Sequence, residues 1–137
     1  MADTTFHLEI ITPEKILISD DVDSVEVPGA YGEFQILAGH TPFLTSLKIG
    51  SVILTKGIKK SHLSVSGGFC EVMPEKTTIL AQTAESANEI DDARSEAAQK
   101  RARKRINDAQ NDESIDVNRA KLALMRAINR INVAGMK

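Results

Sequence analysis

The spacing of apolar side chains changes about two thirds of the way along the chain. Before that point, short runs alternate apolar and polar positions, as Phe6, Leu8 and Ile10 do, and Gly or Pro residues separate the runs. A period of two places one set of side chains on a single face of a strand, and closely spaced turns are typical of antiparallel sheets. The pattern predicts a β-sandwich over residues 1–86 whose last strand spans 77–83.

The rest of the chain follows a helical pattern. No Gly or Pro interrupts residues 76–134, and Ala, Arg, Lys, Glu and Gln, which favour helices, dominate the later part of this segment. Two helices are expected, at 89–109 and 115–134, because the polar segment 107–112 competes for backbone hydrogen bonds between them. The chain is therefore predicted to be an α+β protein, with an antiparallel β-sandwich followed by an antiparallel α-helical hairpin over residues 87–137.

The sequence also predicts which residues cap the two helices and which residues pack them together. Asn88 and Ser114 are expected to cap the two helices, and Gly135 to end the second one. Apolar stripes are expected to join the helices, made of Ile90, Ala93, Ala97 and Ala98 on the first and of Ala120, Leu124, Ala127, Ile131 and Ala134 on the second. Because alanine stripes bury little apolar area, the hairpin should be marginally stable and depend on docking, a ligand or a partner.

Composition limits the chemistry that the chain performs by itself. No segment approaches 18 consecutive apolar residues, so no membrane span is expected. Cys70 is the single cysteine, which excludes an internal disulfide, and it is expected to be a small buried residue. His7, His40 and His62 are scattered, and no phosphate-loop, zinc or nucleophile-elbow motif is present. We therefore predict that the chain is not an enzyme by itself and has no metal site.

Charge separates the two halves of the chain. Residues 1–88 hold 6 Lys and Arg against 11 Asp and Glu, whereas residues 89–137 hold 11 against 8, which indicates two modules with different partners. The cations are concentrated in one run of the first helix, made of Lys100, Arg101, Arg103, Lys104 and Arg105. Like charges at this spacing repel one another. The run either meets an acidic partner protein or RNA, as in a small adaptor, or remains a solvated basic face; the net charge of −2 and the lack of a binding motif argue against RNA.

Several short strings stand out along the chain. The β half contains Ile10-Ile11-Thr12-Pro13-Glu14, Gly32-Glu33-Phe34-Gln35-Ile36-Leu37, Gly39-His40-Thr41-Pro42-Phe43-Leu44 and Ser66-Gly67-Gly68-Phe69-Cys70-Glu71-Val72. The helical half adds Arg119-Ala120-Lys121-Leu122-Ala123-Leu124 and Arg126-Ala127. Each string alone is weakly specific. Together and in this order they resemble the epsilon subunit of bacterial-type rotary ATP synthases, and the resemblance covers nearly the whole chain.

The resemblance implies a non-catalytic rotor subunit of the central stalk. The β-sandwich would dock on the gamma subunit and on the ring of c subunits and rotate with them, coupling proton flow to ATP synthesis. The hairpin would permit ATP hydrolysis when folded against the sandwich and inhibit it when extended up the stalk. Arg103, Lys104 and Arg105 would then meet an acidic segment of the beta subunits within the alpha/beta assembly.

The same resemblance implies which subunits Glu33 and His40 face and where in the cell the chain is located. Glu33 would face the ring and His40 would lie near gamma, although both positions are also explained as ordinary turn residues. The chain would be a peripheral protein on the cytoplasmic side of the bacterial inner, or plasma, membrane, and would reach the membrane only through the complex. It would need no cofactor and bind no nucleic acid.

A subset of these subunits binds ATP through the pattern Ile/Leu-Asp-x-x-Arg-Ala at the start of the first helix. Here the segment reads Ile90-Asp91-Asp92-Ala93-Arg94-Ser95, with Ser95 in place of Ala. By resemblance the ATP-binding residues are Glu85, Ile90, Asp91, Arg94, Arg101, Arg126 and Arg130. Guanidinium groups bind phosphate oxygens well, and Asp91 and Glu85 can accept hydrogen bonds from adenine or ribose.

ATP is thus expected as a regulatory ligand of the hairpin. The alternative is that Asp91 only caps the helix and that the arginines are surface charge. A second copy of the pattern, Ile115-Asp116-Val117-Asn118-Arg119-Ala120, is expected to be a helix start without a ligand of its own.

Overall fold

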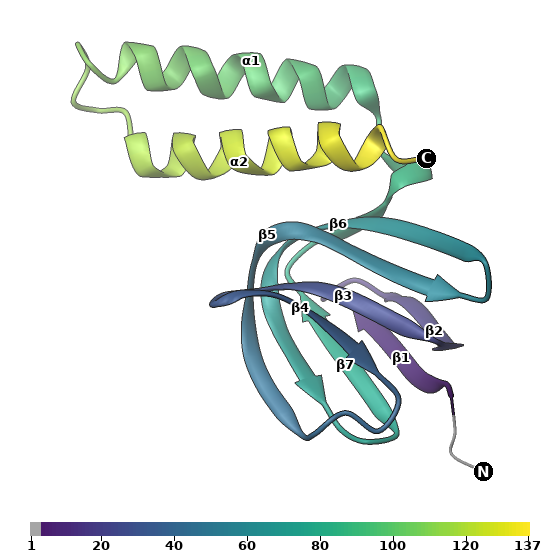
Figure 1. Ribbon diagram of the computed structural model, residues 1–137. Coiled ribbons are helices and arrows are strands. Elements are labelled where there is room, and N and C mark those ends of the chain that lie inside the picture. Colours follow the sequence, from purple (N-terminus) through teal and green to yellow (C-terminus); the bar gives the residue numbers. More distant parts are fainter. Residues whose placement is uncertain (1–3) are drawn as a thin grey trace.

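The computed structural model describes residues 4–137, which form eight strands followed by two long helices (Figure 1). The strands are β1 (Phe6–Ile11), β2 (Ile16–Val22), β3 (Ser24–Gly29), β4 (Gly32–Leu37), β5 (Phe43–Lys56), β6 (Lys59–Val72), β7 (Lys76–Ala81) and β8 (Ala84–Ser86). A 3₁₀ turn, η1 (Ala87–Glu89), leads into α1 (Asp92–Asp108) and α2 (Val117–Ala134). The predicted fold class, a β-sandwich followed by a helical hairpin, is confirmed.

The strands are hydrogen-bonded in the order β2-β1-β7-β6-β5-β3-β4, and β8 pairs with β6. The two 14-residue strands, β5 and β6, run the length of the sandwich. The last five residues of β6 pair with β7, at 68–72, and its middle pairs with β8, at 63–65. Gly68, where the pairing with β7 begins, has a φ of 132°, and a Cβ there would lie 1.9 Å from the carbonyl oxygen of Leu80, so only glycine fits.

One strand pair departs from the antiparallel prediction. β1 and β7 are parallel, with Leu8 opposite Thr77 and Ile10 opposite Ile79. A parallel pair needs a long connection between its strands, and here β2 to β6 supply it. The pair therefore fits into a sandwich that is otherwise antiparallel.

Alternation in the strands produces a single apolar core. Phe6, Leu8 and Ile10 are buried, whereas the intervening residues of β1 are only half-buried. Cys70 is completely buried, as predicted, and desolvation raises the pKa of its thiol to about 12. The core thus follows the period-two pattern of the sequence.

The link between sandwich and hairpin differs from the prediction. The strand expected at 77–83 corresponds to β7, which ends at Ala81, and it is not the last strand, because β8 follows from Ala84. Between them the Gln82 amide donates to Gly67 O and the Ser66 amide donates to Thr83 O.

The predicted N-caps are wrong for both helices. Asp91 caps α1 by accepting a hydrogen bond from the Arg94 amide at 3.0 Å, and Asp116 caps α2 in the same way from the Arg119 amide. Asn88 lies in η1. Ser114 instead donates to Asp112, which lowers the pKa of that carboxyl group. Carboxylates at the caps also suit the positive end of the helix dipole, which explains why they replace the predicted residues.

The helix-packing faces were predicted correctly for α2 and in part for α1. Ala120, Ala127 and Ala134 of α2 are buried, with Leu124 and Ile131 half-buried beside them. For α1, Ile90 just before the helix and Ala98 within it face inward as predicted, but Ala93 and Ala97 are exposed, and Ser95 and Ala102 are buried in their place. The shift by one or two positions rotates α1 about its axis relative to the prediction.

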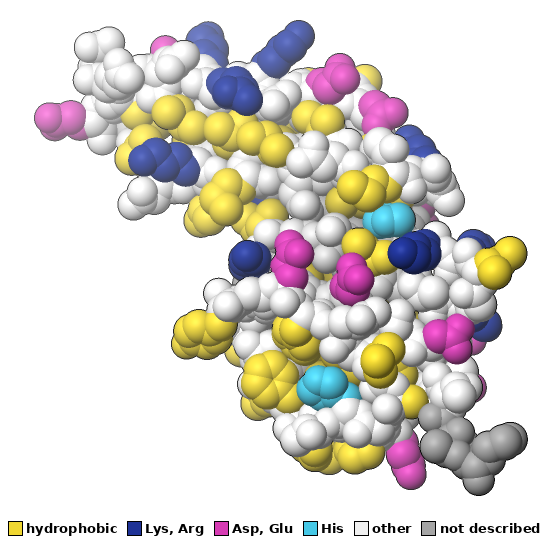
Figure 2. Space-filling view, viewed as in Figure 1, with side chains coloured by type: hydrophobic (Ala, Val, Ile, Leu, Met, Phe, Trp, Pro, Cys, Tyr) yellow, Lys and Arg dark blue, Asp and Glu magenta, His cyan; other side chains and the backbone are white. Residues whose placement is uncertain are grey.

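Of the two helices, α2 lies next to the sandwich and α1 packs on the far side of α2 (Figure 1). The apolar part of the junction is small and consists of Ala87 and Ile90 on one side and Val133 and Ala134 on the other. Hydrophobic side chains also form a band along the junction of the helices, with Lys and Arg side chains on either side of it (Figure 2). Neither helix is long and apolar enough to cross a membrane.

Candidate anion-binding site between hairpin and sandwich

A hollow of about 550 Å³ lies where the hairpin meets the sandwich. It is formed by the second half of α2, the start of α1, and strand and loop residues of the sandwich. Its lining residues are Glu14, Ser64, Val65, Ser66, Thr83, Glu85, Arg94, Arg126 and Arg130. The structure therefore brings together four of the residues predicted to bind ATP, namely Glu85, Arg94, Arg126 and Arg130.

Arg130 and Glu85 join α2 to β8 inside this hollow. Arg130 Nη2 donates to Glu85 Oε2 at 3.0 Å, and Arg130 Nε lies 2.9 Å from Oε1. The Nη2 contact is a hydrogen bond, whereas the buried Nε makes a close ionic contact with Oε1 without hydrogen-bond geometry. A guanidinium group has five N–H donors, so donors of Arg130 outside this pair can bind another acceptor, such as a phosphate oxygen.

Asn129, next to Arg130, makes a second polar connection between α2 and the sandwich. Its side-chain amide donates to Gly50 O at 2.8 Å and to Ser64 Oγ at 2.9 Å. These acceptors belong to the neighbouring strands β5 and β6. The two bonds cross from α2 to two adjacent strands beside the hollow.

The start of α1 places the remaining motif residues around the hollow rather than in it. Asp91 is occupied as the helix cap, and Ile90 is buried against Val133. Ser95 is completely buried, and its hydroxyl donates to Asp91 O at 3.0 Å. The serine that replaces the motif alanine is therefore satisfied within its own helix and adds no free polar group to the hollow.

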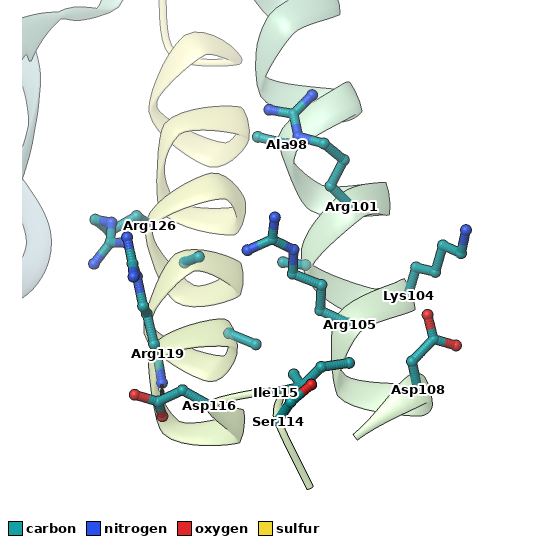
Figure 3. Close-up of a pocket in the computed structure, with 13 residues that line it drawn as sticks. Ala98, Arg101, Lys104, Arg105, Asp108, Ser114, Ile115, Asp116, Arg119 and Arg126 are labelled. Carbon is teal, nitrogen blue, oxygen red and sulfur yellow. Dashed lines mark hydrogen bonds between the residues drawn. The ribbon is translucent and has the colours of Figure 1, made fainter. Parts of the chain in front are cut away.

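A second hollow, of about 760 Å³, lies between the helices beyond the first (Figure 3). Its cationic lining residues are Arg101, Lys104 and Arg105 from α1 and Arg119 and Arg126 from α2. Ala102 and Ala120 are buried at its base, and Asp108 and Asp116 are its acidic lining residues. None of the five cations makes an ion pair with another residue in the described range 4–137. We call this hollow the basic groove.

The basic groove accounts for several predicted residues. Arg101 lines it instead of the hollow at the sandwich, and Arg126 lines both. Lys104 and Arg105 line it as well, whereas Arg103 is exposed elsewhere on α1. The run of cations is thus divided between a groove and an open helix face.

Glu33 and His40 lie at opposite ends of β4. Glu33 is exposed near the β3–β4 turn, opposite Pro28. His40 follows the strand, where its amide donates to Leu37 O and its Nδ1 lies 2.7 Å from Thr41 O. Both are turn-flanking residues, and the structure does not bring them together.

The outer face of the sandwich carries an exposed apolar row. Phe69 of β6 pairs with Leu80 of β7, and Leu80 pairs with Ile11, which in turn pairs with Ile16 of β2. Leu44 extends the row on β5, two residues from the partner of Phe69. Leu44, Phe69, Leu80 and Ile16 are each more than half exposed, at 67%, 57%, 51% and 62%. We call this set the apolar row.

Sequence reasoning missed several residues beside the arginines. Glu14, Ser64, Ser66 and Thr83 line the hollow, and Asn129 lies next to it. The local sequence pattern does not identify them as site residues, because the alternation of apolar and polar residues predicts only which face of a strand a side chain occupies. Their role depends on where α2 docks.

Comparison with known proteins gives a match over almost the whole chain. Residues 5–87 match the family model described as "ATP synthase, Delta/Epsilon chain, beta-sandwich domain", and residues 88–135 match the "long alpha-helix domain" of the same family. A chain in the cryo-EM structure of the Euglena gracilis mitochondrial ATP synthase has the same fold. Its TM-score is 0.82 at 22% identity, over 100% of this chain and 84% of that one.

Bacterial relatives are more similar in sequence. The ATP synthase epsilon chain of Desulforamulus reducens is 46% identical over 95% of this chain and 97% of its own length. That of Nitratidesulfovibrio vulgaris strain DP4 is 47% identical over 96% of each chain, and that of Bacillus cytotoxicus is 45% identical over 97% and 98%. This chain therefore belongs to the family of ATP synthase epsilon chains, which are subunits of that complex and are not themselves catalytic.

Proposed function

We propose that this chain is a rotor subunit of the central stalk that couples proton flow to ATP synthesis and regulates ATP hydrolysis through its hairpin. The observation that carries the rotor role is the apolar row, in which Leu44, Phe69 and Leu80 are exposed together on one face of the sandwich. A contiguous exposed apolar surface is typical of a protein interface. We assign this surface to the gamma subunit, and the loops near Glu33 and His40 to the ring of c subunits and its junction with gamma.

The hairpin is the regulatory element in this proposal. The hairpin is attached to the sandwich by a small apolar cluster, the Arg130–Glu85 ion pair and the Asn129 amide. So few contacts give a small free energy of docking, so the hairpin can detach and dock again. A released hairpin could carry its exposed cations, including Arg103 and Arg105, to an acidic segment of the beta subunits. Opposite charge would favour that association in a salt-dependent way.

ATP is the proposed ligand that favours the docked hairpin. Arg94 of α1 and Arg126 and Arg130 of α2 line the same hollow, so a triphosphate bound there connects both helices to the sandwich. Arg126 also lines the basic groove, which holds Arg101, so the two hollows share one arginine. An anion between these arginines would offset their mutual repulsion and stabilise the folded hairpin.

Calorimetric titration of the full chain with ATP tests the ligand. We expect binding by the wild type and none by an Arg126→Ala, Arg130→Ala double variant. Binding that survives in the double variant would place ATP elsewhere, and no binding by the wild type would leave a rotor subunit without a nucleotide sensor.

Reconstitution tests the inhibitory role. An epsilon-free ATP synthase complex should hydrolyse ATP faster than the same complex with this chain added back. A variant truncated after residue 88 should restore assembly without restoring inhibition. Equal hydrolysis rates with the full and the truncated chain would exclude the hairpin as the inhibitory element.

A further inference from the structure

We propose that Asn129 is the positioning residue that fixes α2 on the sandwich in the register that presents Arg126 and Arg130 to the anion site. The proposal deepens the ATP-sensing function proposed above and rests on it. Its structural half, the docking of α2, is independent of any ligand. The motif predicted for ATP binding does not contain Asn129, and no charge is involved in its contacts.

Both donors of the Asn129 amide are used in the docked state. The Nδ2 atom lies 2.8 Å from Gly50 O on β5 and 2.9 Å from Ser64 Oγ on β6. Ser64 is buried, with 7% of its surface exposed, and itself lines the anion site. A primary amide at this place therefore binds two adjacent strands at once, which fixes both the rotation and the translation of the helix.

The position of Asn129 on α2 explains why it controls the arginines. Residues three and four apart share a face of a helix, so Arg126, Asn129, Arg130 and Val133 form one stripe toward the sandwich. Val133 is buried at the end of this stripe, and Asn129 lies between the two arginines. A helix turns by about 100° per residue, so a slip of one residue would carry the guanidinium groups out of the hollow.

The ion pair cannot perform this positioning during ligand binding. Arg130 is paired with Glu85, and a phosphate would compete for the same guanidinium group. The Asn129 bonds involve neither charged partner. They can therefore hold α2 in place while Arg130 exchanges a carboxylate for a phosphate.

Isosteric replacement provides the test. Asn129→Asp keeps the shape of the side chain but removes both N–H donors and places an oxygen against Gly50 O. Ser64→Ala removes one acceptor and leaves the helix unchanged. Asn132→Asp is the matched control, since Asn132 is an exposed asparagine of the same helix and makes no side-chain hydrogen bond within residues 4–137.

Two measurements on the full chain separate positioning from ligand contact. Hydrogen exchange of α2 amides without nucleotide reports docking, and calorimetry with ATP reports affinity. We expect Asn129→Asp to exchange about tenfold faster and to bind ATP about tenfold more weakly, because loss of docking lowers the competent fraction. Ser64→Ala should show a smaller change in the same direction, and Asn132→Asp none.

Arg94→Ala separates the two roles further. Arg94 lines the site from α1, and its side chain makes no hydrogen bond or ion pair within residues 4–137, so this variant should lose ATP affinity and keep its hydrogen exchange. Wild-type exchange in both Asn129→Asp and Ser64→Ala would overturn the proposal. If the wild type does not bind ATP, the exchange experiment still decides whether Asn129 docks the helix, and only the ligand half fails with the proposed function.

Discussion

The guanidinium group of Arg130 lies against the carboxylate of Glu85, with Nη2 3.0 Å from Oε2 and Nε 2.9 Å from Oε1. The two residues belong to α2 and β8, so the pair spans the junction between hairpin and sandwich. Both side chains are partly shielded, with 24% and 34% of their surface exposed. In the docked hairpin this arginine is therefore paired internally, and an anionic ligand has to share or replace its carboxylate partner.

Replacing Glu85 by Gln should weaken the docking of α2 by about 1 kcal/mol, because the half-shielded Arg130 would lose its ionic partner. Hydrogen exchange of α2 amides in the full chain measures the loss. Glu71→Gln is the matched control, since Glu71 is exposed and forms no ion pair within the described residues. Unchanged protection in Glu85→Gln would mean that the pair contributes nothing to docking.

Replacing Arg119 by Gln should make the hairpin more stable by roughly 0.2–0.5 kcal/mol when the protein is studied alone at low salt. The substitution removes one of the cations of the basic groove and so lowers their mutual repulsion. Thermal unfolding followed by helical circular dichroism gives the change. The gain should vanish in 1 M salt, where the Debye length is about 3 Å. Arg103→Gln, outside the groove, should have less effect, and an equal gain from both variants would argue against repulsion across the groove.

Replacing Phe69 by Ser should disrupt the apolar row without harming the fold. Phe69 is 57% exposed, so we expect the free energy of unfolding to change by about 0.5 kcal/mol or less. Binding to the gamma subunit should weaken by about 2 kcal/mol or more if the row is the interface. Ile58→Ser is the control, since Ile58 is fully exposed in the β5–β6 turn, away from the row. Equal binding by the two variants would place gamma elsewhere.

Replacing Ser95 by Ala restores the motif residue and should leave ATP affinity nearly unchanged. The Ser95 hydroxyl is buried and donates to Asp91 O within the same helix, so its removal should alter stability by about 1 kcal/mol or less. Calorimetric titration of both proteins gives the comparison. A large gain in affinity for the alanine variant would show that the serine restricts the site.

The sandwich was largely predictable, whereas the helix boundaries were less so. Phe6, Leu8 and Ile10 alternate in sequence and are buried together, because in a strand the period of two decides the face directly. Asn88 and Asp91 are both acceptable N-caps on local grounds. The structure selects Asp91, since Asn88 itself lies in η1 and Ile90, which follows η1, is buried against Val133.

Local pattern was sufficient for the strands, the two helices, the arginine rows and the motifs of the epsilon family, because each depends on residues that are close in the chain. It could not place Ser64 and Thr83 beside Arg126 and Arg130, nor could it separate Arg101 from the hollow at the sandwich. These neighbours lie tens of residues apart and meet only when α2 docks on β5 and β6. The direction in which α2 presents its side chains is set by that docking, which depends on shape and hydrogen bonds between distant segments rather than on any periodicity along the chain.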